Sequence, residues 1–128
     1  MKKRPCFILA RKNSKGLKNK NIRLLGDKPL IAHSIEHALN EKIVSHVCVS
    51  TDDPTVADIS DSYGCFTIFP RPKRYSGDNA RTEPALKHAL DIYEKKFGLA
   101  DICFYIQCTE PFRPKNILKK CYDEMMQH

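Results

Sequence analysis

The chain of 128 residues is long enough for one domain with a hydrophobic core and too short for two. Its 41% hydrophobic and 29% charged residues are typical of a soluble globular protein, and no apolar run reaches the ~20 residues that a membrane-spanning helix needs. The formal net charge of +7 indicates an anionic partner or high solubility, without choosing among nucleic acid, nucleotide phosphates and acidic sugars.

The start of the chain and its cysteines both indicate a reducing compartment. The basic residues 1–5 precede an apolar run that is too short for the core of a signal peptide, so we expect a cytoplasmic protein. None of the six cysteines forms a CxxC pair. Four of them, Cys6, Cys48, Cys65 and Cys103, lie in or beside expected strands. We therefore expect reduced cysteines in the core rather than a disulfide scaffold or a zinc site.

Apolar runs and helical patterns alternate along the chain. Runs rich in apolar and β-branched residues predict strands at 5–10, 46–51, 66–69 and 101–107. Apolar residues at helical spacing predict helices at 30–41, 53–63 and 82–97, and a last helix from Pro114 to the chain end. We expect Asp27 to cap the first helix, Asp53 to cap the second, and Gly64 to end the second helix.

This alternation predicts a Rossmann-like α/β fold, in which a parallel sheet lies between two layers of helices. Ligands bind at the carboxyl ends of the strands in such sheets. That rule selects residues 10–21, 51–53, 70–82 and 107–113 as the places for chemistry.

The first of these places, "ARKNSKGLKNKN" at residues 10–21, carries five cationic side chains. It has neither the Walker A pattern nor GxGxxG, because Gly16 is its only glycine. Backbone N–H groups in such a loop can still form an anion-binding nest, with Lys15 and Lys20 as point charges and Arg11 as a planar fork for phosphate oxygens. A polar surface loop is the alternative interpretation of this stretch.

Other polar residues follow the remaining strands. Arg71 lies between two prolines that restrict the backbone and could direct its guanidinium, although a surface arginine is the favoured interpretation of this residue taken alone. Asp52 and Asp53 could bind a metal, but capping of the next helix is the favoured interpretation of Asp53. Gln107 ends the fourth strand and suits hydrogen bonding to a polar ligand such as a sugar, or a turn.

Taken together, these stretches resemble a known family. "ILARKNSKGLKNKNIRLLGDKPLIAHSIEHAL" is similar to the opening of the acylneuraminate cytidylyltransferases, the CMP-sialic acid synthetase family. "VSTDDPTVADISDSYG", "RPKRYSGDNARTE" and "YIQCTEPFRP" resemble later segments of that family in the same order and spacing. The resemblance covers nearly the whole chain. Lys12 and Asn13 depart from it, because they stand where two glycines are common, and Cys108 and Glu110 depart from the Q-x-T-S-P segment.

The resemblance implies a fold of the nucleotide-diphosphosugar transferase type. It implies transfer of CMP from CTP to a nonulosonic acid, an acidic nine-carbon sugar, with release of pyrophosphate. The sugar's anomeric hydroxyl would attack the α-phosphate, and Mg²⁺ would offset the triphosphate charge. Sialic, legionaminic and pseudaminic acids all remain open as the acceptor.

Site residues follow from the resemblance position by position. It implies that Arg11 and Lys20 are catalytic. The nucleotide contacts it implies are Arg11, Lys15, Asn21, Arg71, Ala80 and Thr82. The sugar-side contacts it implies are Gln107 and Arg113.

Residues 1–128 would then be the CTP-binding portion of a cytidylyltransferase domain. The resemblance implies that the metal-binding aspartates and the dimerisation arm belong to a C-terminal half beyond residue 128, so the metal ligands are unknown and the full-length form is expected to be a homodimer. A non-catalytic nucleotide-binding module and a Kdo-type cytidylyltransferase are the alternatives. We expect neither a nucleic-acid nor a membrane partner, because no nucleic-acid-binding motif accompanies the positive charge.

Overall fold

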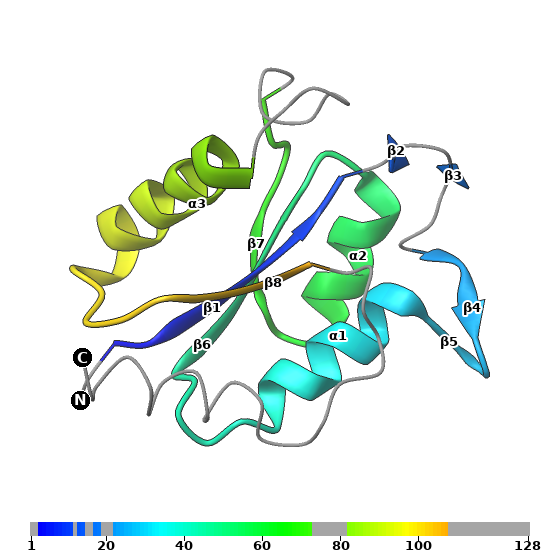
Figure 1. Ribbon diagram of the computed structural model, residues 1–128, viewed down its shortest axis with the longest axis horizontal. Helices are drawn as coiled ribbons and strands as arrows, with labels where there is room; N and C mark the ends of the chain where they lie inside the picture. Colours follow the sequence, from blue (N-terminus) through cyan, green and yellow to red (C-terminus); the bar gives the residue numbers. More distant parts are fainter. Residues whose placement is uncertain (1–2, 12, 15–16, 19–21, 73–81, 108–128) are drawn as a thin grey trace.

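The computed structural model describes residues 3–11, 13–14, 17–18, 22–72 and 82–107. Its central sheet has four parallel strands, β1 (Pro5–Ala10), β6 (His46–Thr51), β7 (Phe66–Ile68) and β8 (Phe104–Gln107), in the order β7-β6-β1-β8. Three helices cover the sheet: α1 (Leu30–Leu39), α2 (Pro54–Ser62) and α3 (Thr82–Phe97). Figure 1 shows α1 and α2 on one side of the sheet and α3 on the other.

This arrangement confirms the predicted Rossmann-like three-layer fold. The strands β1 and β6 and the helix α3 begin and end where the sequence predicts, while β7 ends one residue early and β8 starts later than expected. The expected helix from Pro114 lies outside the described residues. No helix in the described part of the chain is long and apolar enough to cross a membrane.

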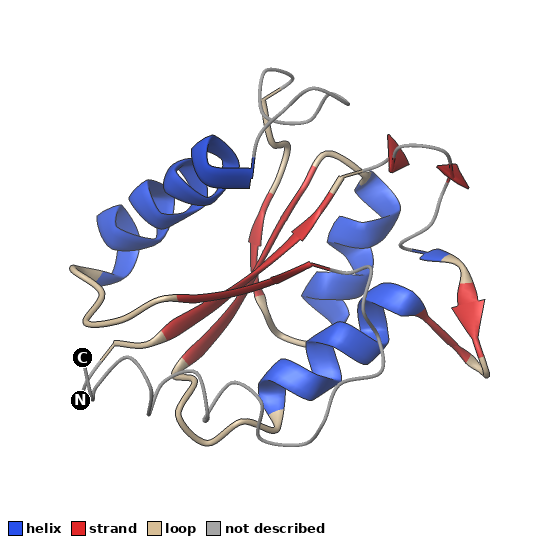
Figure 2. Ribbon diagram, in the orientation of Figure 1, coloured by secondary structure: helices blue, strands red, loops and turns tan. Residues whose placement is uncertain are grey.

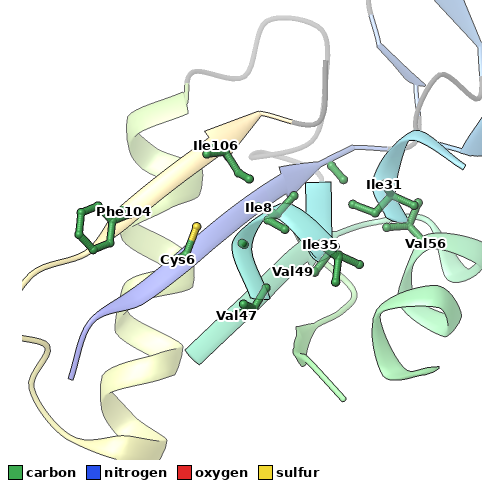
Figure 3. Close-up of a cluster of buried hydrophobic side chains, with 11 residues drawn as sticks. Cys6, Ile8, Ile31, Ile35, Val47, Val49, Val56, Phe104 and Ile106 are labelled. Carbon is green, nitrogen blue, oxygen red and sulfur yellow. The ribbon is translucent and has the colours of Figure 1, made fainter. Parts of the chain in front are cut away.

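Side chains of β1 alternate between two cores because successive residues of a strand point to opposite faces. Cys6, Ile8 and Ala10 belong to a cluster with side chains of α1, α2, β6 and β8, part of which Figure 3 shows. Phe7 belongs to a second cluster with Cys48, Ile68, Ala89 and Tyr93, on the α3 side. The sheet is therefore buried on both faces, as parallel sheets usually are.

The second helix begins and ends as predicted. Asp53 caps it by accepting a hydrogen bond from the backbone N–H of Thr55 (2.9 Å), and Pro54 occupies the first turn. Gly64 follows the last turn with φ +76°, a conformation that glycine adopts without steric cost.

The prediction that Asp27 caps the first helix is wrong. Asp27 lies in the two-residue turn of a hairpin between β4 (Leu24–Leu25) and β5 (Lys28–Pro29), visible at the side of the sheet in Figure 2. Gly26 takes φ +71° in that turn. Pro29 instead occupies the N-cap position of α1, and no side-chain hydrogen bond caps this end of the helix.

A second short hairpin lies in the basic loop after β1. There β2 (Asn13–Ser14) pairs antiparallel with β3 (Leu17–Lys18). Strands of two residues each are too short to show the apolar alternation from which a strand is predicted.

Of the cysteines predicted to be reduced, Cys6 and Cys48 are buried and Cys65 and Cys103 partly buried, and all four are free thiols. Burial raises the pKa of the Cys65 thiol to about 11, so this thiol stays protonated at neutral pH. Cys6 and Cys48 are each part of one of the two cores. Their chemistry is that of small apolar residues, as expected.

A ring cluster attaches α3 to the amino end of β6. A hydrogen bond of 2.7 Å joins the hydroxyl of Tyr93 to Nδ1 of His46, and the ring centroids of His46 and Phe97 are 4.5 Å apart. Burial, and to a smaller extent the charge of Lys3, lower the pKa of His46. The neutral imidazole is therefore the form that this cluster favours.

Because Ile8 is fully buried between the helix layer and two strands, we predict that Ile8→Ala lowers the free energy of unfolding by about 2–5 kcal/mol. The measurement is urea denaturation followed by circular dichroism. Leu99→Ala is the control, since Leu99 is 81% exposed and its truncation should change stability by less than about 0.5 kcal/mol. Equal losses in the two variants would contradict the assignment of Ile8 to the core.

We also predict that the lowered pKa of His46 makes stability depend on pH. Below about pH 6.5 the unfolded chain protonates this histidine before the folded chain does, so the free energy of unfolding decreases as pH falls from about 6.5 toward the folded pKa. An NMR titration of the His46 ring should give a midpoint below 6.5. His46→Gln should show a weaker decrease in unfolding free energy between pH 7.5 and 5.5, and an unchanged decrease would refute the prediction.

Candidate functional site

The carboxyl ends of the four parallel strands lie together at one edge of the sheet, the carboxyl edge. The order in which the chain adds strands reverses within this sheet. From β1 the chain adds β6 and β7 on one side, and then β8 pairs with β1 on the other, so the switch point lies between β1 and β8. Open α/β sheets bind ligands outside the carboxyl ends at such a point. Arg11 directly follows β1, and Gln107 ends β8 in register with Leu9. The topology therefore brings Arg11 and the backbone of Gln107 to this edge.

Arg71 lies just past β7 and is only 5% exposed. Its Nε donates to Oγ of Ser50 (3.1 Å) and its Nη2 donates to the backbone carbonyl of Ser50 (2.6 Å). Its own backbone N–H donates to the carbonyl of Thr51 (2.9 Å). These contacts tie Arg71 to the last two residues of β6, so its guanidinium is held at the carboxyl edge of the sheet.

Three charged groups interact at this edge. Burial lowers the pKa of Arg71 to about 10 because the charged guanidinium has lost water; nearby, Asp52 raises this pKa and Arg11 lowers it. Arg71 still carries its charge at neutral pH. The residues come from the ends of three different strands, β1, β6 and β7. Two guanidinium groups and one carboxylate leave a net positive charge, which suits a phosphate or another polyanion.

Asp53 contributes to the fold of this edge rather than to a ligand site. It is 4% exposed, its side chain caps α2, and its backbone N–H donates to Oγ1 of Thr51 (3.0 Å). The favoured prediction of a capping role is therefore confirmed. Asp52 remains the partly exposed carboxylate of the pair.

The structure describes only some of the other predicted site residues. Thr82 is the first residue of α3 and Gln107 the last of β8, and the structure describes the backbone of both but not their side chains. Outside the described residues lie Lys15, Lys20, Asn21, Ala80 and Arg113. Arg11 and Arg71 are thus the two predicted residues whose interaction the structure describes, and the roles of all nine stay predictions.

Sequence reasoning missed Ser50. The residue is fully buried near the carboxyl end of β6 and accepts two hydrogen bonds from the guanidinium of Arg71. A signal was present in "HVCVST", where two hydroxyl residues directly follow the apolar run Val47–Val49. A buried polar side chain needs a hydrogen-bond partner, and that requirement could have directed attention to this position.

The described residues do not fit a magnesium site by themselves. They contain no group of three or more side chains from histidine, cysteine, aspartate and glutamate that could hold a metal ion. Magnesium in nucleotide sites is usually held by one or two carboxylates together with the phosphates and water. Asp52 offers one such carboxylate, and Asp53 is occupied as a cap.

Residues 6–128 match the family described as cytidylyltransferase. The pseudaminic acid cytidylyltransferase of Campylobacter jejuni subsp. jejuni serotype O:23/36 is 37% identical over 123 residues, which cover 96% of this chain and 53% of that protein. The N-acylneuraminate cytidylyltransferase of Escherichia coli O18:K1:H7 is 42% identical over 108 residues, which cover 84% of this chain and 25% of that protein. The chain thus spans about half, or less, of the length of these relatives.

Solved structures agree with the sequence relatives. A CMP:2-keto-3-deoxy-manno-octonic acid synthetase complexed with CTP superimposes with a TM-score of 0.77 at 27% identity, covering 98% of this chain and 48% of the other. The element order of this chain and its positive carboxyl edge agree with the match over residues 6–128. This chain belongs to the cytidylyltransferase family.

Proposed function

We propose that this chain is the nucleotide-binding portion of a cytidylyltransferase that transfers CMP from CTP to a nonulosonic acid. The observation that carries the proposal is the buried, charged guanidinium of Arg71 at the carboxyl edge, electrostatically coupled to Arg11. A cation held in place and shielded from water interacts more strongly with a phosphate than a mobile surface cation does. The relatives named for pseudaminic and N-acylneuraminic acid support the class of acceptor.

In the proposed reaction the anomeric hydroxyl oxygen of the sugar bonds to the α-phosphorus of CTP. The bond from that phosphorus to the bridging oxygen breaks, pyrophosphate leaves with the electron pair, and the hydroxyl proton passes to solvent. Arg11 and Arg71 would bind phosphate oxygens and stabilise the charge that develops on them. Lys20 is the further cation proposed for this step, and Lys15 and Asn21 are proposed to bind the nucleotide.

Other parts of the proposal rest on the resemblance and the relatives. Ala80 and Thr82 are proposed to contact the nucleotide, and Gln107 and Arg113 the sugar. Mg²⁺ is proposed as the counter-ion of CTP, and among the described residues at the carboxyl edge Asp52 offers one partly exposed carboxylate. A homodimer of the full-length form and a cytoplasmic location also remain predictions.

Two alternatives can be ranked. A Kdo-type enzyme is less favoured, because the identity to the octonic acid synthetase is 27%, against 37% and 42% to the nonulosonate enzymes. The other alternative is a module that binds CTP without turnover, which turnover by this chain would exclude.

Arg11→Ala should weaken CTP binding by about 1–3 kcal/mol, because a charged hydrogen-bond donor to phosphate is lost. Isothermal titration of the 128-residue chain with CTP and MgCl₂ measures the change. Lys42→Ala is the control for net charge, since Lys42 is exposed in the turn before β6, away from the carboxyl edge. Equal affinities of wild type and Arg11→Ala would remove Arg11 from the site, and no binding by wild type would refute CTP binding by this chain.

A pyrophosphate-release assay separates the enzyme from the binding module. With CTP, MgCl₂ and each of sialic, legionaminic and pseudaminic acid, we expect CTP-dependent pyrophosphate with one of the three acids and none with the eight-carbon acid Kdo. CTP binding without release by this chain would support the module. Release with Kdo alone would overturn the nonulosonate proposal.

A further inference from the structure

Ser50 holds an unusual place for a polar residue. It is the fifth residue of β6, fully buried, and lies in register between Leu9 of β1 and Ile68 of β7. Burial of a hydroxyl without a partner is unfavourable, and an apolar residue would suit a strand that is paired on both edges. The position therefore calls for a reason beyond packing.

That reason is the guanidinium of Arg71. The hydroxyl and the carbonyl oxygen of Ser50 accept from two of its three nitrogens, Nε at 3.1 Å and Nη2 at 2.6 Å. Because the planar guanidinium is held at both Nε and Nη2, it cannot rotate about the Cδ–Nε bond without breaking one of these two contacts. The carbonyl is present whatever residue occupies this position, so the hydroxyl is the part of the clamp that depends on serine.

We propose that Ser50 is a positioning residue, whose hydroxyl fixes the orientation in which the Arg71 guanidinium meets the nucleotide. The inference rests on the proposed function for its ligand, while the clamp itself is described independently of any ligand. Without the hydroxyl, the Nε–H loses the acceptor that Ser50 Oγ provides, and the orientation of the guanidinium is less restricted. The free chain then no longer presents the guanidinium in the bound orientation, which weakens binding.

Ser50→Ala and Ser34→Ala form a matched pair. Both serines are fully buried, but Ser34 Oγ has no hydrogen-bond partner in the part of the chain that the structure describes. Hydrogen exchange of the Arg71 Nε–H, followed by ¹⁵N NMR, reports the clamp without any ligand. We expect exchange to accelerate about tenfold in Ser50→Ala, the result of losing one hydrogen bond, and to stay unchanged in Ser34→Ala.

CTP titration then tests the link to function. Ser50→Ala should raise the Kd about tenfold, Ser34→Ala should leave it unchanged, and Ser50→Thr, which keeps a hydroxyl, should restore most of the affinity. In a double-mutant cycle, Ser50→Ala should add no further loss once Arg71→Ala is present, because Ser50 acts through Arg71. A role in packing alone would give the same loss in both backgrounds.

The outcomes separate this inference from the proposed function. Unchanged Nε–H exchange in Ser50→Ala overturns the positioning role whatever happens with CTP, and so does an equal Kd for wild type and Ser50→Ala. If neither wild type nor Ser34→Ala binds CTP, the proposed function is overturned together with the ligand named here. Three results together support the inference: accelerated Nε–H exchange in Ser50→Ala, a raised Kd for CTP in that variant, and no further loss of affinity from Ser50→Ala in the Arg71→Ala background.

Discussion

The strand β1 is the constraint on which the rest of the structure depends. It is hydrogen-bonded on both edges, to β6 and to β8, and its alternate side chains enter both hydrophobic cores. Because both neighbours are parallel to it, each must be reached by a crossover over one face of the sheet. The crossovers place α1 and α2 on one face of the sheet and α3 on the other. The order in which strands are added therefore reverses between β1 and β8.

The candidate site is a consequence of that reversal. Residues distant in the sequence, Arg11, Asp52 and Arg71, follow three strands whose carboxyl ends meet at one edge. Burial lowers the pKa of Arg71 to about 10, and the charges of Asp52 and Arg11 shift this pKa in opposite directions. A buried guanidinium requires acceptors, and Ser50 supplies both of those described. The sheet thus provides both the position of the cation and the groups that orient it.

Local patterns predicted much of this fold because they depend on neighbours in the chain. The buried run of β1 and the 16-residue helix α3 were predictable from periodicity. Asp53 was predictable as a cap because capping needs only a side-chain oxygen on the residue directly before the helix. The same local argument gave a wrong prediction for Asp27. Its side chain suits a helix cap, but Asp27 lies in the turn of the β4–β5 hairpin, which ends before the helix begins.

Taken alone, the sequence determined the parallel α/β order, the edge at which a ligand site is expected, and the family to which the chain belongs. The tertiary structure decided which polar side chains meet at that edge. The burial of Arg71 and its clamp on Ser50 join positions 21 residues apart. No periodicity records such a contact, because it arises only when two strands pair side by side and water is removed from the space at their ends.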